Sequence, residues 1–416
     1  MQQKIFKRTI EAHYHLRDLV TTTPTVRDSY ISEVYGANIF LKREDLQIVR
    51  SYKLRGAFNK MRLLPHPKDK LVFCASAGNH AQGVAYSCAV LNVKGKIFMP
   101  VTTPNQKIKR VKYFGKQWVE VVLVGDTYDD ASKIALAACE AEQGVFIHPF
   151  DDPDVIAGQG TVGLEILNSL SSVTIDYLFV PVGGGGLLSG IVTVFKQLSP
   201  NTRIIGVEPA GAASLKASMD KGEVVELPSV DGFIDGAAVK KVGELPFQIV
   251  KDQLYDLVAI PEGKVCTTLL TLYNEDAIVV EPAGALSVAA LRFYADEIKG
   301  KNVVCIISGG NNDIVRMEEI KERSLLYEGL KHYFIVQLPQ RPGALRFFIS
   351  EIIGPDDDIS YFQYSKKNSR ERGPVVIGIE VKDKSAYRVL TEKMTQHNIA
   401  YTYLNNTPDL FTHLIG

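Results

Sequence analysis

The sequence predicts an α/β fold with two doubly wound lobes, followed by a smaller α+β domain. Short β-branched runs alternate with helix-like stretches over residues 70–150, and a second block of the same kind follows Asp151; this alternation is typical of β-α-β units on a parallel sheet. The composition then changes after a charged helix at Ile314–Tyr327. The 416 residues exceed what one hydrophobic core usually covers. We therefore expect a first domain at residues 1–327, with a small lobe of about residues 55–150 inserted in the large lobe, and a second domain at 328–416.

The first domain can be followed element by element. A helix is expected over Ile5–Leu16, then a turn at Thr22–Pro24 and a strand over Ile39–Lys42. In the small lobe we expect the strands Leu71–Cys74, Lys96–Met99 and Val119–Val124, and the helices His80–Leu91, Gln106–Tyr113 and Tyr128–Glu142. In the rest of the large lobe we expect the strands Tyr177–Val182, Ile204–Val207, Leu257–Ile260 and Val303–Ile307.

The second domain has a different order of elements. Strands are expected at His332–Leu338, Ile359–Tyr364 and Val375–Val381, helices at Ala344–Ile352 and Ser385–Gln396, and a last strand near Tyr401. This β-α-β-β-α order predicts a ferredoxin-like split βαβ domain. The basic run Lys366–Arg372 lies between two of these strands, so we expect a solvated hairpin loop there and no nucleic-acid partner.

The composition is that of a globular protein. Hydrophobic residues make up 46% of the chain, and 47 basic residues balance 47 acidic ones. Five scattered cysteines without C-x-x-C spacing indicate buried thiols in a reducing compartment. The segment Met1–Leu16 has no apolar run of signal-peptide length. We therefore expect a cytoplasmic protein without a membrane segment.

Four glycines give the strongest local signal for a binding site. Gly183, Gly184, Gly185 and Gly186 follow a buried-type strand and precede the helix-like stretch Leu187–Leu198. Backbone N–H groups can approach an anion closely where residues lack a β-carbon, and the start of a helix adds favourable partial charge. A flexible linker would not be bracketed by a buried strand and an apolar helix. The pattern is neither G-x-G-x-x-G nor a Walker loop, which favours a single phosphate.

Three other segments supply polar groups. Lys53 begins a helix-like segment beside small and aromatic neighbours, where an ammonium group loses its proton more easily; taken alone, however, Lys53 and Arg55 could lie on a solvated surface. The loop Ser76–Gly83 follows a strand and opens a helix, which suits a carboxylate ligand, although Ser76 or Asn79 could be an ordinary N-cap and His80 a packed side chain. The loop Ser308–Asn312 ends a strand at the expected ligand-binding edge of the sheet.

A lysine amine, a phosphate turn, a carboxylate loop and a polar strand end together suit pyridoxal phosphate and an amino-acid substrate. The segments Ser51–Ala57, Ser76–Gly83, Gly183–Gly186 and Ser308–Asn311 resemble, in this order, the motifs of the threonine dehydratases (threonine ammonia-lyases). These are pyridoxal enzymes of the tryptophan-synthase-β-like class, fold type II. The resemblance extends from about residue 4 to the end and is to the biosynthetic type with a single C-terminal ACT-like domain. It implies conversion of L-threonine, and also L-serine, to a keto acid and ammonia; with threonine this is the first step of isoleucine biosynthesis. A homotetramer is also implied.

The resemblance also implies a role for each matching residue. Lys53 would form the Schiff base with the cofactor and, once freed, remove the Cα proton. Asn79 would meet the ring oxygen, Ser308 the pyridine nitrogen, and Gly183–Gly186 the phosphate. The neutral Ser308 cannot hold the pyridine nitrogen protonated, which suits β-elimination over transamination. The residues expected around the substrate are Ser76, Ala77, Gly78, Asn79 and His80.

Two departures from related enzymes narrow the prediction. Serine racemases resemble this chain but carry a serine where Ala77 stands, so racemisation here lacks its second proton carrier. The related metal site would map to Glu208, Ala212 and Ser214, with Ser214 in place of a carboxylate, and we expect no metal. The alternatives are a catabolic serine/threonine dehydratase and a non-catalytic amino-acid sensor, although retention of Lys53 argues against the sensor.

The turn after the first strand of the second domain resembles the ligand loop of ACT-like regulatory domains. Pro339, Arg341 and Gly343 lie in this turn. Glycine at 343 lets backbone N–H groups face a small carboxylate. By resemblance, isoleucine or valine is the expected effector. The alternative is a domain that binds no effector and only mediates assembly.

Overall fold

The computed structural model describes residues 1–364, 372–407, 410–411 and 414. The chain divides into two compact units, Met1–Asp313 and Ile314–Gly416. This division lies before the boundary that we expected after Tyr327, because helix α14 (Met317–Tyr327) belongs to the second unit. The Glu322 carboxylate of α14 accepts hydrogen bonds from Lys331 Nζ at 2.5 Å and from Tyr333 Oη at 2.6 Å.

A six-stranded sheet forms the centre of the large lobe. Its strands, in the order β1-β2-β10-β7-β8-β9, are parallel except for β1. Their bounds are β1 Thr25–Arg27, β2 Asn38–Arg43, β7 Tyr177–Pro181, β8 Arg203–Pro209, β9 Asp256–Ile260 and β10 Asn302–Ile307. The central strands β7 and β10 read as continuous apolar runs because the sheet is covered on both faces.

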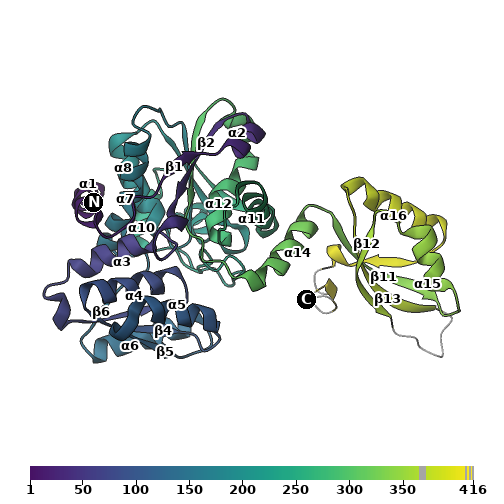
Figure 1. Cartoon of the computed structure of the whole chain (residues 1–416), viewed down its shortest axis with the longest axis horizontal. Helices are drawn as coiled ribbons and strands as arrows, with labels where there is room; N and C mark the ends of the chain where they lie inside the picture. The colour runs from purple at the N-terminus through teal and green to yellow at the C-terminus, as the bar shows by residue number, and fades with distance from the viewer. Residues whose placement is uncertain (365–371, 408–409, 412–413, 415–416) are drawn as a thin grey trace. The chain divides into compact units, whose positions relative to one another are not determined.

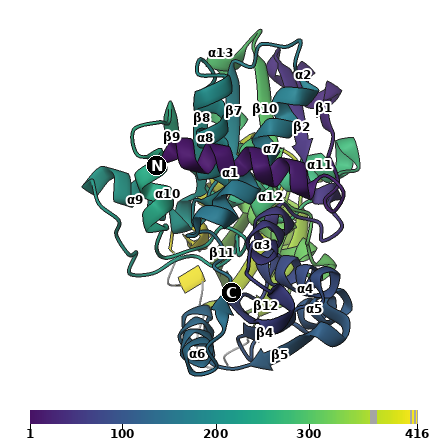
Figure 2. The same ribbon diagram turned by 90° about the vertical axis from the view of Figure 1, so that its left-hand side faces the viewer.

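Helices cover the two faces of this sheet. Helices α1, α7 and α8 lie on one side and α11 and α12 on the other (Figure 1), and α1, α7 and α8 lie in front of the strands in Figure 2. The helices of the large lobe are α1 Gln2–Leu16, α2 Ser29–Tyr35, α7 Pro153–Ser169, α8 Gly186–Leu198, α9 Ser214–Lys221, α10 Glu244–Val250, α11 Glu262–Asp276, α12 Pro282–Ala289 and α13 Ala295–Ile298. Side chains of α1, α7 and α8 pack with those of β7 and β8 into the main core of the lobe.

The small lobe is built on a second, fully parallel sheet. Its strand order is β5-β4-β3-β6, with bounds β3 Leu71–Ala75, β4 Lys94–Met99, β5 Val119–Leu123 and β6 Val145–Phe146. The accompanying helices are α3 Lys53–Arg62, α4 Asn79–Leu91, α5 Asn105–Gly115 and α6 Tyr128–Ala141. The α3, α4 and α5 side chains pack on one face, and those of α6 pack on the other against Phe73 and Phe98.

The second unit has the expected ferredoxin-like topology, with an antiparallel sheet of order β12-β13-β11-β14. The bounds are β11 Lys331–Pro339, α15 Ala344–Phe347, β12 Asp358–Tyr364, β13 Arg372–Glu380, α16 Lys384–Gln396 and β14 Tyr401–Tyr403. The expected helix Ala344–Ile352 is present but ends in a wider π-helical turn at Phe348–Ile352. Of the basic run, Arg372 opens β13 and the rest lies outside the described residues.

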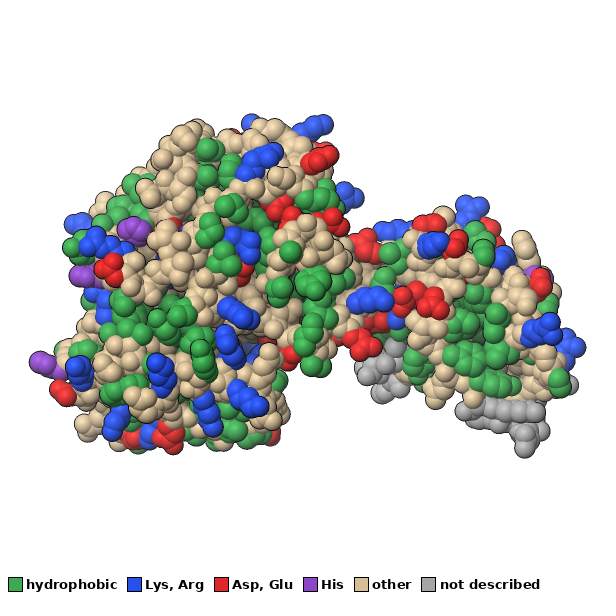
Figure 3. Space-filling model, in the orientation of Figure 1, with side chains coloured by type: hydrophobic (Ala, Val, Ile, Leu, Met, Phe, Trp, Pro, Cys, Tyr) green, Lys and Arg blue, Asp and Glu red, His purple; other side chains and the backbone are tan. Residues whose placement is uncertain are grey.

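The surface of Met1–Asp313 mixes charges of both signs. On the face shown in Figure 3, basic side chains are scattered among acidic and apolar ones, consistent with the equal numbers of basic and acidic residues in the whole chain. Within the part of the chain that the structure describes, no helix combines the length and the apolar composition needed to cross a bilayer.

Candidate active site

The first unit contains a cavity of about 490 Å³ between its two lobes. Strands β3 and β7 end at Ala75 and Pro181, and both residues line it. This is the edge of parallel sheets at which ligands bind. The cavity brings together most of the residues predicted from the sequence, which are Lys53, Ser76, Ala77, Gly78, Asn79, His80, Gly183, Gly184, Gly185 and Gly186.

Lys53 begins α3, and its amine lies at the cavity wall. Its Nζ donates a hydrogen bond to the Pro149 backbone oxygen at 2.9 Å. Burial lowers the pKa of Lys53 to about 8, and the Glu281 carboxylate opposes this shift in part. A lysine with this pKa has a substantial neutral fraction near pH 8, so its amine can act as a nucleophile or a base.

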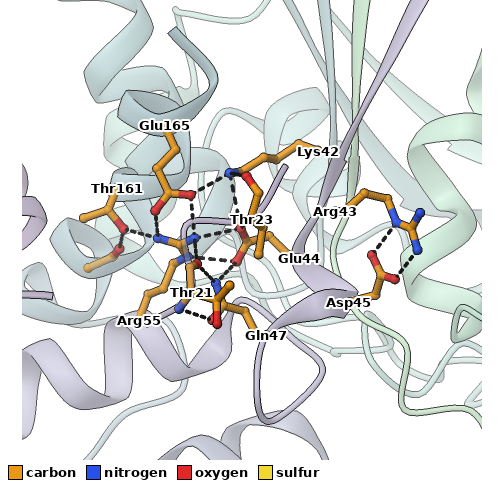
Figure 4. A network of polar contacts seen from close by, with 11 residues as sticks. Thr21, Thr23, Lys42, Arg43, Glu44, Asp45, Gln47, Arg55, Thr161 and Glu165 are labelled. Carbon is orange, nitrogen blue, oxygen red and sulfur yellow. Dashed lines mark hydrogen bonds and ion pairs between the residues drawn. The ribbon is translucent and has the colours of Figure 1, made fainter. Parts of the chain in front are cut away.

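A buried charge network anchors α3 through Arg55, two residues after Lys53 (Figure 4). Arg55 is fully buried and forms ion pairs with Glu44 at 2.8 Å and Glu165 at 2.6 Å. Lys42 Nζ lies 2.5 Å from the Glu165 carboxylate and donates to the Thr23 backbone oxygen at 2.7 Å. Two cations thus face two carboxylates inside the protein. The alternative that Lys53 and Arg55 lie on a solvated surface is wrong, because Arg55 is fully buried and Lys53 lines the cavity.

The glycine turn has the geometry of an anion cradle. Gly185 has φ +87°, a left-handed conformation that favours glycine, and a β-carbon on Gly184 would overlap the ring of Phe150. Gly186 begins α8, whose first N–H groups have no acceptor within the helix. The cavity has the size of a small-molecule site. The residues present therefore fit a phosphate-bearing cofactor.

Asn79, at the start of α4, lies in a hydrogen-bonded row. Its Nδ2 donates to Glu281 Oε1 at 2.6 Å, and its Oδ1 accepts from Asn311 Nδ2 at 2.7 Å. Burial and the nearby charge of Asp235 raise the pKa of Glu281 to about 7. We did not predict Glu281 as a site residue, since Glu281-Pro282 reads as the start of a helix, and Asn311 was part of a motif without an assigned role.

Two predicted residues lie differently from the rest. Ser308 is buried beside the cavity but not among the residues that line it, and its Oγ donates to the Ala283 backbone oxygen at 3.2 Å. His80 is among the residues that line the cavity, but its Nε2 lies 2.8 Å from the Ile147 backbone oxygen. Burial lowers the pKa of His80 to about 3, so the ring is neutral. This contact suits a packed histidine.

Glu208 caps a helix. Its carboxylate accepts the backbone N–H groups of Leu215 and Lys216, both at 2.8 Å. Over the described ranges, no group of three or more His, Cys, Asp or Glu side chains is placed to hold a metal ion.

In the predicted effector turn of the second unit, Arg341 and Gly343 are exposed and Pro339 is half-buried. Pro339 ends β11, Gly343 has φ +84°, and the Arg341 backbone N–H donates to the Pro339 oxygen at 3.0 Å. A separate cavity of about 550 Å³ in this unit is lined by Ile349, Ile353, Ile359, Asp357, Asp358 and Lys393, among others. The turn does not line this cavity.

Comparison with known proteins identifies the family. Residues 16–309 match the family model described as "Pyridoxal-phosphate dependent enzyme", and residues 322–414 match the "C-terminal regulatory domain of Threonine dehydratase". The chain is 55% identical over 409 residues to the biosynthetic L-threonine dehydratase of Halalkalibacterium halodurans, covering 98% of each chain. It is 56% identical over 410 residues to that of Bacillus subtilis, covering 98% of this chain and 97% of the relative.

A solved structure agrees with these matches. The processed form of threonine deaminase isoform 2 from Solanum lycopersicum superposes with a TM-score of 0.73 at 40% identity, covering 77% of this chain and 94% of that one. The predicted fold class, two α/β lobes of the fold-type-II class plus a C-terminal α+β regulatory domain, is confirmed. The chain belongs to the pyridoxal-phosphate dependent enzymes and, among them, to the biosynthetic threonine dehydratases.

Proposed function

We propose that this chain dehydrates and deaminates L-threonine to 2-oxobutanoate and ammonia, as the first step of isoleucine biosynthesis. The observation that carries the proposal is that the Lys53 amine, the glycine turn and the Ser76–His80 loop line the same cavity. When bound, pyridoxal phosphate supplies an electron sink for the negative charge that develops at the substrate Cα.

Each part of the cavity has a proposed task. Gly183–Gly186 and the start of α8 hold the phosphate, and the loop before α4 holds the substrate carboxylate. The neutral amine of Lys53 takes the proton from Cα on one face of the substrate. Water is then lost across Cα and Cβ, and hydrolysis of the product releases ammonia. Ala77 offers no acid on the opposite face, which favours elimination over racemisation.

Replacement of the lysine tests the proposal. Lys53→Ala is expected to remove the visible absorption of lysine-bound pyridoxal phosphate and to reduce keto-acid formation from threonine to background. Lys60→Ala is the matched control, because Lys60 lies on the same helix but pairs with Asp152 at 2.7 Å and does not line the cavity. Full activity of Lys53→Ala would contradict the proposal.

The same assay separates two alternatives. A catabolic serine/threonine dehydratase would turn over L-serine comparably well, and a non-catalytic sensor would bind threonine without forming keto acid. We further propose that the enzyme works in the cytoplasm. We also propose that it is a homotetramer, and analytical ultracentrifugation can test this oligomeric state.

We also propose that the C-terminal unit binds isoleucine or valine at the turn containing Pro339, Arg341 and Gly343. The match of residues 322–414 to a regulatory domain supports an effector role for this unit. An inhibitor of this kind binds one global state better than another, so isoleucine should raise the threonine concentration needed for half-maximal rate.

A further inference from the structure

A row of hydrogen bonds crosses the cavity wall and joins segments that are far apart in the sequence. Asn311 Nδ2 donates to the Val49 backbone oxygen at 2.8 Å and to Asn79 Oδ1 at 2.7 Å. Asn79 Nδ2 donates in turn to Glu281 Oε1 at 2.6 Å. Asn79, Glu281 and Asn311 all line the cavity, and none of these bonds is used in the roles proposed above.

The direction of each hydrogen bond in this row follows from its first member. A backbone carbonyl can only accept, so the Asn311 amide must turn its NH2 group towards Val49. The second hydrogen of that NH2 group then faces Asn79, which must present its oxygen. The Asn79 NH2 group is thereby turned towards Glu281, whose Oε1 accepts from it. One N–H group of Asn79 remains for a ligand in the cavity.

The Glu281 carboxylate is held in place by more than Asn79. It is 6% exposed, and the backbone of Asn311 also forms a hydrogen bond to it. A β-carbon on Gly309 would overlap its Oε1, and one on Gly236 would lie 3.3 Å from the same atom. The Glu281 carboxylate therefore has little freedom to move, and its position sets the orientation of the Asn79 amide.

We propose that Glu281 and Asn311 are positioning residues that orient the Asn79 amide, so that its remaining N–H group points to the ring oxygen of pyridoxal phosphate. This proposal rests on the proposed function and on the role that the family resemblance implies for Asn79, which is to meet that oxygen. Glu281 acts here through Asn79, and its charge does not have to reach the cofactor directly.

A double-mutant cycle on the holoenzyme tests whether the two residues act through Asn79. The single variants are Glu281→Met, Asn311→Leu and Asn79→Ala. The two double variants combine Asn79→Ala with Glu281→Met or with Asn311→Leu. The readouts are the pH-dependent absorption spectrum of the bound cofactor, the dissociation constant for pyridoxal phosphate, and kcat. Glu281→Gln keeps an acceptor of the same size and serves as the conservative variant.

We expect Glu281→Met and Asn311→Leu to shift the spectral titration in the same direction as Asn79→Ala. Each should weaken cofactor binding roughly tenfold, the effect of misdirecting one hydrogen bond of ordinary strength. Asn311→Leu should add nothing to the spectral shift once Asn79 is alanine, and Glu281→Met should add less than it does alone, because its charge also acts on Lys53. In Glu281→Gln, most of the spectral shift and most of the loss of cofactor affinity seen in Glu281→Met should be absent. Asp235→Asn removes another carboxylate of the cavity wall and should shift the titration less than either positioning variant.

Two results would overturn the proposal while leaving the proposed function intact. One is a spectral shift from Glu281→Met that is as large in the Asn79→Ala background as in the unaltered enzyme. The other is a shift of the spectral titration in Asp235→Asn that equals the shift in Glu281→Met. Loss of any negative charge from the cavity wall would then explain the shift. If the unaltered chain binds pyridoxal phosphate but Asn79→Ala leaves its spectrum unchanged, the role of Asn79 fails, and the positioning proposal fails with it. If the unaltered chain binds no pyridoxal phosphate, the proposed function itself fails.

Discussion

At the scale of single residues, the pKa of Lys53 makes cofactor attachment depend on pH. Attachment needs the neutral amine, whose fraction rises with pH and levels off above a pKa of about 8. For an ordinary lysine the rise would continue to about pH 10.4. We therefore expect the rate of pyridoxal phosphate incorporation into the apoprotein to be half-maximal near pH 8 and to reach a plateau about one pH unit higher, as measured by stopped-flow absorbance.

Glu281→Gln provides the control for this prediction. The Glu281 carboxylate raises the pKa of Lys53, in opposition to burial. The neutral side chain removes that effect, so the midpoint of the rate profile should move to lower pH. A rate that keeps rising to pH 10 in the unaltered protein, or a midpoint that moves upward in the variant, would contradict the assignment.

The residues that sequence reasoning found, and those that it missed, differ in a physical way. Lys53, Asn79 and Gly183–Gly186 lie next to strand ends or helix starts, where local pattern indicates their position. Glu281 also lies at a helix start, but Glu281-Pro282 shows only the ordinary pattern of a helix N-terminus and points to no ligand. The Asn79–Asn311 contact joins residues 232 positions apart, and it exists because loops from both lobes meet at one cavity. Such contacts depend on packing that no short window of sequence contains.

At the scale of secondary-structure elements, the buried network of Figure 4 fixes helix α3. Arg55→Met leaves Glu44 and Glu165 buried with only Lys42 as a counter-charge. Breaking a buried pair from one side typically costs about 3–5 kcal/mol. We expect a loss of this size in urea unfolding, together with weaker cofactor binding, because Lys53 begins the same helix.

Arg43→Met is the matched control for this variant. Arg43 pairs with Asp45 at 2.7 Å but is partly exposed. Its loss should cost no more than about 1 kcal/mol. The Arg55 network should also be sensitive to acid, because Arg55 holds the pKa of Glu44 below its usual value despite burial. The stability that the ionised Glu44 contributes is fully present above the usual pKa of a glutamate. It is lost as the pH falls through the lowered pKa. Equal losses from the two variants would contradict the anchoring role.

The sequence predicts most strands because the parallel sheets produce long apolar runs. The named strands of the large lobe and of the small lobe are each present within a few residues of the expected bounds. The missed strands β1 and β6 have three and two residues, too few to show a period. Helix α14 was recognised but assigned to the first domain, because its Glu322 contacts to Lys331 and Tyr333 cannot be read from the charged pattern alone.

At the scale of the whole molecule, regulation can be tested at two places in the C-terminal unit. If isoleucine binds at the exposed turn, Arg341→Met should reduce isoleucine inhibition about tenfold or more, through loss of a charged partner for the carboxylate. Lys393→Met serves as the comparison variant. It also removes a lysine charge from this unit, but Lys393 lines the separate cavity and lies outside the turn. Threonine kinetics with and without isoleucine, and calorimetry of isoleucine binding, measure both variants. A response lost in Lys393→Met and kept in Arg341→Met would move the effector to that cavity.

Residues Asn311–Asp313 line the catalytic cavity, and the next residue begins the C-terminal unit. The Glu322 contacts to Lys331 and Tyr333 join α14 to β11 of that unit. The main chain therefore connects α14 to Asn311, which donates a hydrogen bond to Asn79, through only a few peptide bonds. If the proposed effector acts by moving α14, residues inserted between Asp313 and Ile314 should weaken its effect on the cavity.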